Sequence, residues 1–536
     1  MNVDGSKRQG IFGVSAGVGE VGTATRRVDS SVSYGMIADL LHDDPDHVLF
    51  SAFPMRGGKE PRPMLKRINV YTGRSKDQGR APVPHAQFLT DHKGQARFAA
   101  GSTSSGEAKV YYRKDASEDW ILVHSQDDLY LDITPLAFAS ENEVYVAGRQ
   151  DHSIEGLYKW NMESGKKELL YLDDYADPAE YLLSADQRKL YGLVVQAGYP
   201  NYVFVDEQAE ETKLLKAMIS ALDGQFVRLR HQSYDGRFSV VTAGSDRDPG
   251  SFYLYDSHSN KMRFLAKARP WVDPAESAEV RPIRFEARDG LVIHGLLTLP
   301  RGREDKGLPL IVHPHGGPHG PRDWWGYNST TQFLASRGYA VLQVNFRGSG
   351  GYGKEFEKAG YRHWGDKIQY DILDGTHYVI EQGIVDKERI CIYGASFGGY
   401  SALQAAVVEP DLFKCTLGFV GVYDLEMMHK KGDIPKRETG RKYLNKVIGK
   451  DKQELIRFSP VHNVDKLKAS VFILHGKEDE RVPIEQAYAL RDALDAIDYP
   501  YKWKVVKKEG HGFYNEDNRA EMFEEMVTFF DEHLKL

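Results

Sequence analysis

The sequence predicts an N-terminal β-propeller over residues 1–275 and a C-terminal α/β-hydrolase, a doubly wound and mostly parallel sheet, over residues 276–536. Three observations lead to this fold class. A strand-rich pattern repeats along the first half, buried strands alternate with helices in the second half, and a proline-containing linker separates them. A chain of 536 residues is also too long for one ordinary core.

The first half repeats a unit that consists of a hydrophobic strand, a glycine-rich or charged turn and an aromatic strand. Successive units begin roughly 46 to 49 residues apart, the length of one four-stranded propeller blade. An irregular β-sandwich is the alternative, but sandwiches lack such a repeat. Five blades are visible and residues 2–5 are typical of a sixth, half-entered blade, so we expect five to six blades and an incomplete propeller. The visible units begin near Val48, Arg97, Val144, Leu190 and Phe238.

The second half begins after a linker at residues 270–274, which contains two prolines. A hairpin is expected at residues 289–290. Continuous apolar strands separated by amphipathic helices then predict a parallel sheet with both faces covered. Functional sites of such sheets lie at the carboxyl ends of the strands. Strands are expected at 310–312, 340–344, 390–393, 471–474 and 503–506, and helices at 367–382, 399–409, 485–497 and 518–534.

Composition excludes several classes of protein. Hydrophobic residues make up 41% of the chain and charged residues 27%, a balance typical of globular proteins. A net charge of −7 gives no reason to expect a nucleic-acid partner. No apolar run is long enough to span a membrane, so no membrane partner is expected.

The N-terminal residues and the two cysteines bear on the cellular location and on disulfide formation. Residues 1–7 lack the apolar core of a signal peptide, so we expect a cytoplasmic protein; it would be periplasmic or secreted if a leading segment with a signal peptide is missing. The only cysteines, Cys391 and Cys415, argue against a disulfide framework. Each lies in an apolar run, where we expect a small buried hydrophobic side chain.

The strand at 390–393 is followed by Gly-Ala-Ser-Phe-Gly-Gly and then by a helical segment. This is the pattern of a nucleophile elbow, in which small neighbours allow a strained turn that exposes the hydroxyl of Ser396. The five-residue pattern by itself also occurs by chance in ordinary turns. Its place between a buried strand and a helix therefore carries the prediction.

A serine nucleophile needs a base, and the base needs an orienting acid, at later strand ends in the order Ser, Asp, His. The strand at 471–474 leads to Asp479, and the strand at 503–506 leads to His511. Both lie where Ser396 is expected, at the carboxyl edge. We predict these three as the catalytic residues, with Glu478 as the alternative acid. Such a site needs no metal and no organic cofactor.

The tetrahedral oxyanion that forms in such a reaction is usually stabilised by two backbone N–H groups. The first is predicted to be that of Phe397, directly after the nucleophile. The second is predicted to be that of Gly317, or of Gly316, in the His-Gly-Gly-Pro loop after the strand at 310–312. The alternative is a plain Gly/Pro turn. The loop histidines His313, His315 and His319 are interpreted as polar loop residues, because no carboxylate accompanies them as a metal ligand.

The second domain resembles the prolyl oligopeptidase family of serine peptidases, especially its acylaminoacyl-peptidase-like branch, strongly over residues 276–536. Over residues 1–275 the likeness is architectural, since members carry an N-terminal propeller that restricts access to the site. The chain departs from the family in having fewer blades than the usual seven or eight, and no clear glutamate pair of the dipeptidyl members. The resemblance rests on residues 315–318, 345–353, 364–365, 394–400, 475–483 and 509–513.

The resemblance implies a serine peptidase that hydrolyses short peptides or acyl-peptides through an acyl-enzyme on Ser396, as an oligopeptidase or acylaminoacyl peptidase. It also implies that Arg481 holds a substrate backbone carbonyl; the alternative is a surface salt bridge. Val482 is expected to form a wall of the specificity pocket together with the segment 419–428.

Two other functions stay open at this point. A carboxylesterase would use the same triad, because the fold does not choose between amide and ester. A propeller-based binding protein with a vestigial hydrolase is the third hypothesis, against which the intact triad argues. A homo-oligomer is also left open by the sequence.

Overall fold

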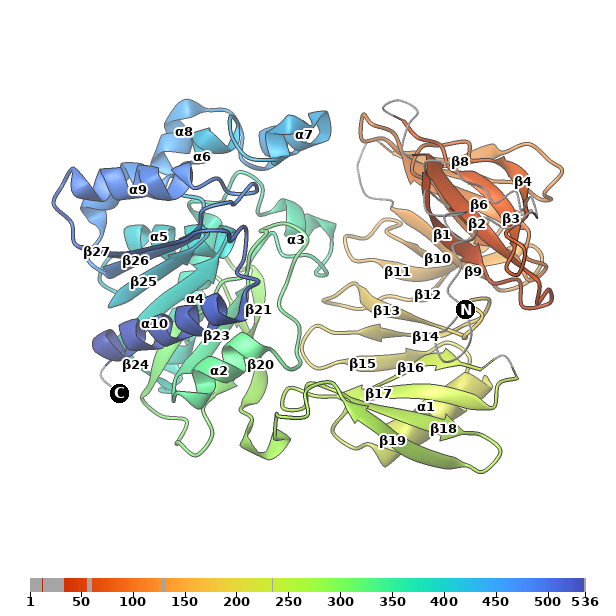
Figure 1. Ribbon diagram of the computed structural model, residues 1–536, viewed down its shortest axis with the longest axis horizontal. Coiled ribbons are helices and arrows are strands. Elements are labelled where there is room, and N and C mark those ends of the chain that lie inside the picture. Colours follow the sequence, from red (N-terminus) through yellow and green to blue (C-terminus); the bar gives the residue numbers. More distant parts are fainter. Residues whose placement is uncertain (1–11, 13–32, 55–59, 127–131, 234, 535–536) are drawn as a thin grey trace, which may run out of the picture. The chain divides into compact units, whose positions relative to one another are not determined.

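The structure, a computed structural model, describes residue 12 and residues 33–54, 60–126, 132–233 and 235–534 (Figure 1). The chain divides into two compact units. The first contains the part up to Asp174 together with Glu180–Val194 and Tyr202–Leu214. The second contains Tyr175–Ala179, Val195–Asn201 and the chain from Leu215 onward. The domain boundary that the sequence predicts at residue 275 stays a prediction.

Five antiparallel sheets follow one another along the described residues, each with its strands in sequence order. They are the blades of a β-propeller, so this part of the predicted fold class is confirmed. The half blade expected at residues 2–5 lies outside the described residues. The first sheet contains β1 (Ser33–Asp39), β2 (His47–Pro54), β3 (Met64–Asn69) and β4 (Ser75–Arg80), and the second contains β5 (Gln87–Thr90), β6 (Ala96–Ser102), β7 (Ala108–Tyr112) and β8 (Ile121–Gln126). The third contains β9 (Ile133–Phe138), β10 (Glu143–Gly148), β11 (Gly156–Asn161) and β12 (Lys167–Tyr171), and the fourth contains β13 (Pro178–Leu183), β14 (Leu190–Val195) and β15 (Asn201–Phe204). The fifth contains β16 (Phe226–Gln232), β17 (Phe238–Gly244), β18 (Ser251–Asp256) and β19 (Lys261–Lys267). Helix α1 (Glu210–Ala221) precedes the fifth sheet.

Buried side chains of the blades lie mainly on their middle strands. In β7, every second residue is buried, as the two-residue period of a strand requires. Phe98 of β6 lies 4.9 Å from the ring of Tyr112 and 5.7 Å from that of Phe138, so aromatic side chains of the second and third blades share one core. The aromatic strands β7 and β11 are therefore core strands, whereas β15 and β18 are only partly buried.

The second unit contains an eight-stranded sheet in the order β20-β21-β23-β22-β24-β25-β26-β27. The first three strands pair antiparallel, and all pairs from β23 to β27 are parallel. Each strand expected from the sequence lies within a strand of this sheet. The strands are β20 (Glu279–Glu286), β21 (Val292–Leu299), β22 (Leu308–Val312), β23 (Ala340–Asn345), β24 (Val385–Ala395), β25 (Cys415–Phe419), β26 (Ser470–Gly476) and β27 (Tyr501–Val506).

Helices cover both faces of this sheet (Figure 1). On one face, Met526 and Phe530 of α10 pack in a core with Cys415 and Leu417 of β25. The residue between these two, Thr416, points to the other face and donates its hydroxyl to the carbonyl of Ala402 in α5. The α/β-hydrolase part of the predicted fold class is thus confirmed. The helices are α2 (Ser329–Ser336), α3 (Lys354–Lys358), α4 (Lys367–Glu381), α5 (Phe397–Val408), α6 (Leu425–Met428), α7 (Glu438–Val447), α8 (Lys452–Arg457), α9 (Glu485–Asp495) and α10 (Glu516–Leu534).

The two cysteines correct one expectation. Both are fully buried, as predicted, but they form a disulfide instead of acting as separate hydrophobic side chains. The reason is register: Cys391 of β24 lies directly opposite Cys415 of β25, with their Cα atoms 4.7 Å apart. Because β25 was not among the expected strands, the sequence pattern did not bring the two residues together.

Helix α5 is the most completely buried helix that reaches the site, with side chains from Phe397 to Val407 buried on every side. Its apolar character reflects its place against the sheet.

Among the described residues, no helix is both long and apolar enough to cross a membrane.

Candidate active site

Ser396 lies in the turn between β24 and α5. Its backbone has φ 58° and ψ −119°, a strained conformation for a residue with a side chain. Its N–H donates to the carbonyl of Phe419 over 2.9 Å, and its own carbonyl accepts the N–H of Tyr400 over 3.0 Å. The turn predicted as a nucleophile elbow is therefore present, and it leaves Ser396 partly exposed.

Close backbone approach explains the glycines on either side of Ser396. A Cβ on Gly394 would stand 2.3 Å from the carbonyl carbon of Gly398, and one on Gly399 would stand 2.9 Å from the carbonyl oxygen of Phe419. Real Cβ atoms do not come so near, so strand and helix meet at this angle only because these positions lack side chains.

His511 connects the hydroxyl of Ser396 with a carboxylate. Its Nε2 lies 3.0 Å from Ser396 Oγ, and its Nδ1 lies 2.7 Å from Asp479 Oδ2. The side chain of His511 is 30% exposed, whereas that of Asp479 is fully buried. A carboxylate at Nδ1 directs the free lone pair of Nε2 towards the serine, which is the arrangement that a general base requires.

Asp479, rather than Glu478, is the carboxylate that contacts His511. Glu478 is exposed, whereas the second carboxylate oxygen of Asp479 accepts the backbone N–H groups of Arg481 at 2.9 Å and of Val482 at 2.8 Å. Three donors thus hold one carboxylate in a tight turn after β26. These contacts fix its orientation towards His511.

The loop that carries His511 is closed by Glu509. This buried carboxylate accepts the N–H groups of Tyr514 at 2.9 Å and Asn515 at 3.1 Å, and the amide of Asn518 at 2.7 Å. The hydrogen bond from the Asn518 amide has the largest effect, and together with the two backbone donors it lowers the pKa of Glu509 below its ordinary value. Glu509 therefore stays ionised and holds both ends of the turn around His511.

The predicted oxyanion loop lies beside the nucleophile. A Cβ on Gly316 would stand 3.6 Å from Ser396 Cβ and 3.3 Å from the carbonyl oxygen of Ala395. Gly317 has φ 130° and faces Pro321 and His319 instead. Phe397, the other predicted donor, is the first residue of α5, and its ring is buried against those of Trp364 and Phe346 at 4.9 Å and 5.6 Å. Of the two glycines, Gly316 is the one next to Ser396.

The three loop histidines have partners in the protein. His313 Nδ1 lies 2.9 Å from the carbonyl of Tyr393, His315 Nε2 lies 2.8 Å from Ser349 Oγ, and His319 Nε2 accepts the indole N–H of Trp364 at 3.0 Å. Burial lowers the pKa of His315 to about 4 and that of His319 to about 3, so both rings are neutral. Within the described ranges, no group of three His, Cys, Asp or Glu side chains is arranged to hold a metal ion.

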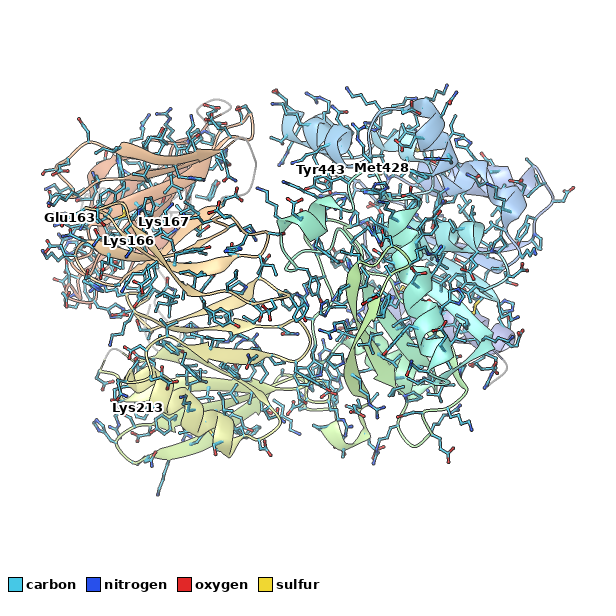
Figure 2. The ribbon with its side chains drawn as sticks, turned by 180° about the vertical axis from the view of Figure 1, so that it is seen from behind. Glu163, Lys166, Lys167, Lys213, Met428 and Tyr443 are labelled. Carbon is cyan, nitrogen blue, oxygen red and sulfur yellow. A yellow bond between two sulfur atoms is a disulfide. The ribbon has the colours of Figure 1, made fainter. Side chains whose placement is uncertain are left out.

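Arg481 and Val482 lie in the acid turn, in different surroundings. Arg481 is half exposed, and its Nε lies 2.7 Å from Asp433 Oδ1. Asp433 belongs to the segment between α6 and α7, helices on which Figure 2 labels Met428 and Tyr443. Val482 is buried, and its carbonyl accepts a hydrogen bond from His475 Nε2 over 2.8 Å. The substrate contacts expected for both residues stay predictions.

Two residues of the site were not singled out from the sequence. Glu509 closes the loop of His511, and His475 lies at the end of β26 beside Asp479, with Nε2 3.6 Å from Asp479 Oδ2. A signal was present for each. His475 is a polar residue at the end of an apolar strand, and Glu509 stands two residues before the predicted base.

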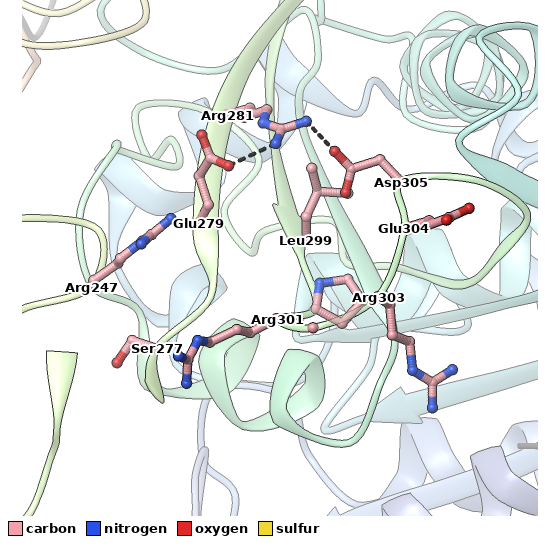
Figure 3. Close-up of a pocket in the computed structure, with 11 residues that line it drawn as sticks. Arg247, Ser277, Glu279, Arg281, Leu299, Arg301, Arg303, Glu304 and Asp305 are labelled. Carbon is pink, nitrogen blue, oxygen red and sulfur yellow. Dashed lines mark hydrogen bonds and ion pairs between the residues drawn. The ribbon is translucent and has the colours of Figure 1, made fainter. Parts of the chain in front are cut away.

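A hollow of about 380 Å³ in the same unit has a different character (Figure 3). Arg281 stands between Glu279 and Asp305, at 2.7 Å and 2.6 Å, so its guanidinium is paired with two carboxylates. None of the residues predicted for catalysis or binding lines this hollow. Its lining residues are Arg247, Ser277, Glu279, Arg281, Leu299, Pro300, Arg301, Gly302, Arg303, Glu304 and Asp305.

Comparison with known proteins agrees with the geometry. Residues 325–536 match the family model described as the prolyl oligopeptidase family. The chain is 28% identical to dipeptidyl aminopeptidase BIII of Pseudoxanthomonas mexicana, over 81% of this chain and 64% of that protein. It is 27% identical to the acylamino-acid-releasing enzyme of Rattus norvegicus, over 48% of this chain and 35% of the relative.

Solved structures show the same fold. A puromycin-hydrolyzing peptidase of Mycobacterium tuberculosis superposes with a TM-score of 0.68 at 20% identity, over 91% of this chain and 77% of that one. The acylaminoacyl peptidase of Pyrococcus horikoshii gives a TM-score of 0.65 at 18% identity, over 91% and 80% of the two chains. The chain spans 64% of the length of the Pseudoxanthomonas relative, which is less than two thirds.

Proposed function

Because residues 325–536 match the model of the prolyl oligopeptidase family, we propose that the chain is a serine peptidase that hydrolyses short peptides or acyl-peptides through an acyl-enzyme on Ser396. The observation that carries this proposal is the relay of Asp479, His511 and Ser396, with separations of 2.7 Å and 3.0 Å. The two relatives named above are a dipeptidyl aminopeptidase and an acylamino-acid-releasing enzyme, and these names support an amide as the bond that is cleaved.

His511 Nε2 takes the proton of the Ser396 hydroxyl as Oγ attacks the amide carbonyl. Asp479 stabilises the imidazolium that forms. The N–H groups of Phe397 and of Gly316 or Gly317 stabilise the oxyanion, and the close approach of Gly316 to Ser396 favours Gly316. His511 then gives its proton to the leaving amine, and a water molecule hydrolyses the acyl-enzyme with His511 again as the base.

A fluorophosphonate probe and a substrate panel test this function. Ser396→Ala should lose both labelling and peptide cleavage, and near wild-type turnover by this variant contradicts the proposal. The panel compares a free dipeptidyl anilide, an acetyl-aminoacyl anilide and a blocked peptide anilide, because the relatives include dipeptidyl and acylaminoacyl enzymes. A protein that cleaves p-nitrophenyl esters but none of the three anilides is a carboxylesterase. A wild-type protein that the fluorophosphonate does not label is a vestigial hydrolase.

Two coarser expectations accompany this proposal. The domain that holds the site is taken to begin near residue 276, and the chain is left as a candidate homo-oligomer. Light scattering of the purified protein measures the oligomeric state directly. Neither expectation changes the chemistry at Ser396.

A further inference from the structure

His475 is a buried histidine that faces the acid of the relay from behind. It lies at the end of β26, with no exposed side-chain surface. Its Nε2 is 2.8 Å from the carbonyl oxygen of Val482 and 3.6 Å from Asp479 Oδ2. A carbonyl oxygen only accepts hydrogen bonds, so the proton of the imidazole must be on Nε2.

Burial keeps this imidazole neutral. Removal from water lowers the pKa of His475 below its ordinary value, and it outweighs the attraction of the nearby Asp479 carboxylate. The Nδ1 atom is buried and has no hydrogen-bond partner among the described residues, which agrees with an unprotonated nitrogen. A neutral ring does not compete with the imidazolium of His511 for Asp479.

The contact of His475 closes the turn that orients the acid. The peptide groups that precede Arg481 and Val482 donate to Asp479 Oδ1, and the next peptide carbonyl, that of Val482, accepts from His475. One end of the turn is thus bound by Asp479 itself and the other end by the imidazole. With Oδ1 held in this way, Oδ2 points to His511 Nδ1.

We propose that His475 is a positioning residue of the catalytic relay: through its hydrogen bond to Val482 it holds the 479–482 turn, so that Asp479 stays aligned with His511 when the imidazolium forms. This inference rests on the proposed serine-peptidase function. The alternative is a core histidine that stabilises the fold without any effect on the relay.

Two amide variants test the hydrogen bond itself. In His475→Gln, the side-chain amide nitrogen takes the place of Nε2 and reaches Val482. In His475→Asn, the amide is one carbon shorter and does not reach. The Asn variant should lose about 10- to 100-fold in kcat with little change in KM, the usual scale for a residue that orients a catalytic group. The Gln variant should keep most of the activity.

The pH profile is the second readout. In the Asn variant, the acid limb of kcat/KM should move to lower pH, because a less well aligned Asp479 stabilises the imidazolium less. A purely structural histidine would change the melting temperature and leave this limb in place. Circular dichroism and thermal melts of both variants show whether they are folded.

A double-mutant cycle with Asp479→Ala tests whether His475 acts through the acid. If it does, His475→Asn should have no further effect on the residual rate of Asp479→Ala. An equal loss in both backgrounds overturns the inference, and so does wild-type kcat for a folded His475→Asn. Ser396→Ala is measured in parallel. If this variant stays active, the proposed function itself has failed. If Ser396→Ala loses activity and His475→Asn keeps it, only the role of His475 is refuted.

Discussion

Gly398 in the first turn of α5 lies against the carbonyl oxygen of Pro314, and a Cβ at residue 398 would stand 2.2 Å from that oxygen. The nucleophile elbow and the predicted oxyanion loop are therefore in backbone contact. A side chain at residue 398 would therefore push the two backbones apart, because a main-chain atom, unlike a flexible side chain, does not swing away from such a contact.

Gly398→Ala should accordingly separate the two predicted oxyanion donors. We expect kcat to fall by roughly 100-fold, the scale for loss of one donor, while the protein still folds. Steady-state kinetics on a peptide anilide measure this. Gly302→Ala is the control for a glycine substitution without a clash, since no atom lies within 4 Å of a Cβ at residue 302, although its φ of 75° adds backbone strain. Wild-type kcat for Gly398→Ala would show that the donors lie elsewhere.

Glu509→Gln should loosen the loop of His511. The carboxylate uses both oxygens as acceptors, and in the variant one NH2 group would face a backbone N–H. An unmatched buried donor costs about 1–3 kcal/mol, so we expect kcat to fall about 10-fold or more at unchanged KM. The control is Glu516→Gln, an exposed residue at the start of α10. Equal kinetics for the two variants would refute the role of Glu509.

Arg481→Ala separates substrate binding from a surface ion pair. If Arg481 holds a substrate carbonyl, kcat/KM should fall about 10-fold for peptide anilides, the value of one charge-assisted hydrogen bond. Hydrolysis of p-nitrophenyl acetate, which lacks that carbonyl, should be unchanged. Asp433→Asn, which frees Arg481 from its ion pair, should leave peptide cleavage intact.

If Arg481 is only a surface ion pair, the result is different. Arg481→Ala would then change neither substrate and would alter the free energy of unfolding by less than about 1 kcal/mol. Arg491→Ala, which removes the surface pair with Asp492, supplies the comparison for that case.

Asp323 predicts a dependence of stability on pH. Its Oδ1 accepts the amide of Gln343 at 2.6 Å, its Oδ2 is buried without a partner among the described residues, and burial raises its pKa to about 7. The folded state then binds the proton more tightly than the unfolded state. Its contribution to stability is greatest below about pH 4 and is lost as the pH rises to about 7.

Asp323→Asn removes this titration. We expect its melting temperature to exceed that of the wild type above pH 7, and the difference to shrink towards pH 4. Thermal melts across this range measure the effect, with the exposed Asp517→Asn as control. A constant difference between Asp323→Asn and the wild type over the range would refute it.

Much of the site follows from local sequence. Ser396, Asp479 and His511 each stand a few residues after an apolar strand, and parallel strands bring their carboxyl ends to one edge. The sequence predicted Asp479 with Glu478 as the alternative, because the two are adjacent, and only the path of the turn shows which of them is buried. His475 and Glu509 carried a local signal, but their backbone partners in the two turns follow only from the fold.

By itself, the sequence determined the elements: a repeated blade, a series of buried strands and helices, and a turn whose glycines leave room for the strained backbone of Ser396. These properties depend on periodicity and on residues that are near one another in the chain. Only the tertiary structure decided which side chains meet: Cys391 with Cys415, Gly398 with Pro314, and His475 with Asp479. Strand order and turn path set those contacts, and both arise from packing over the whole sheet rather than from any single segment.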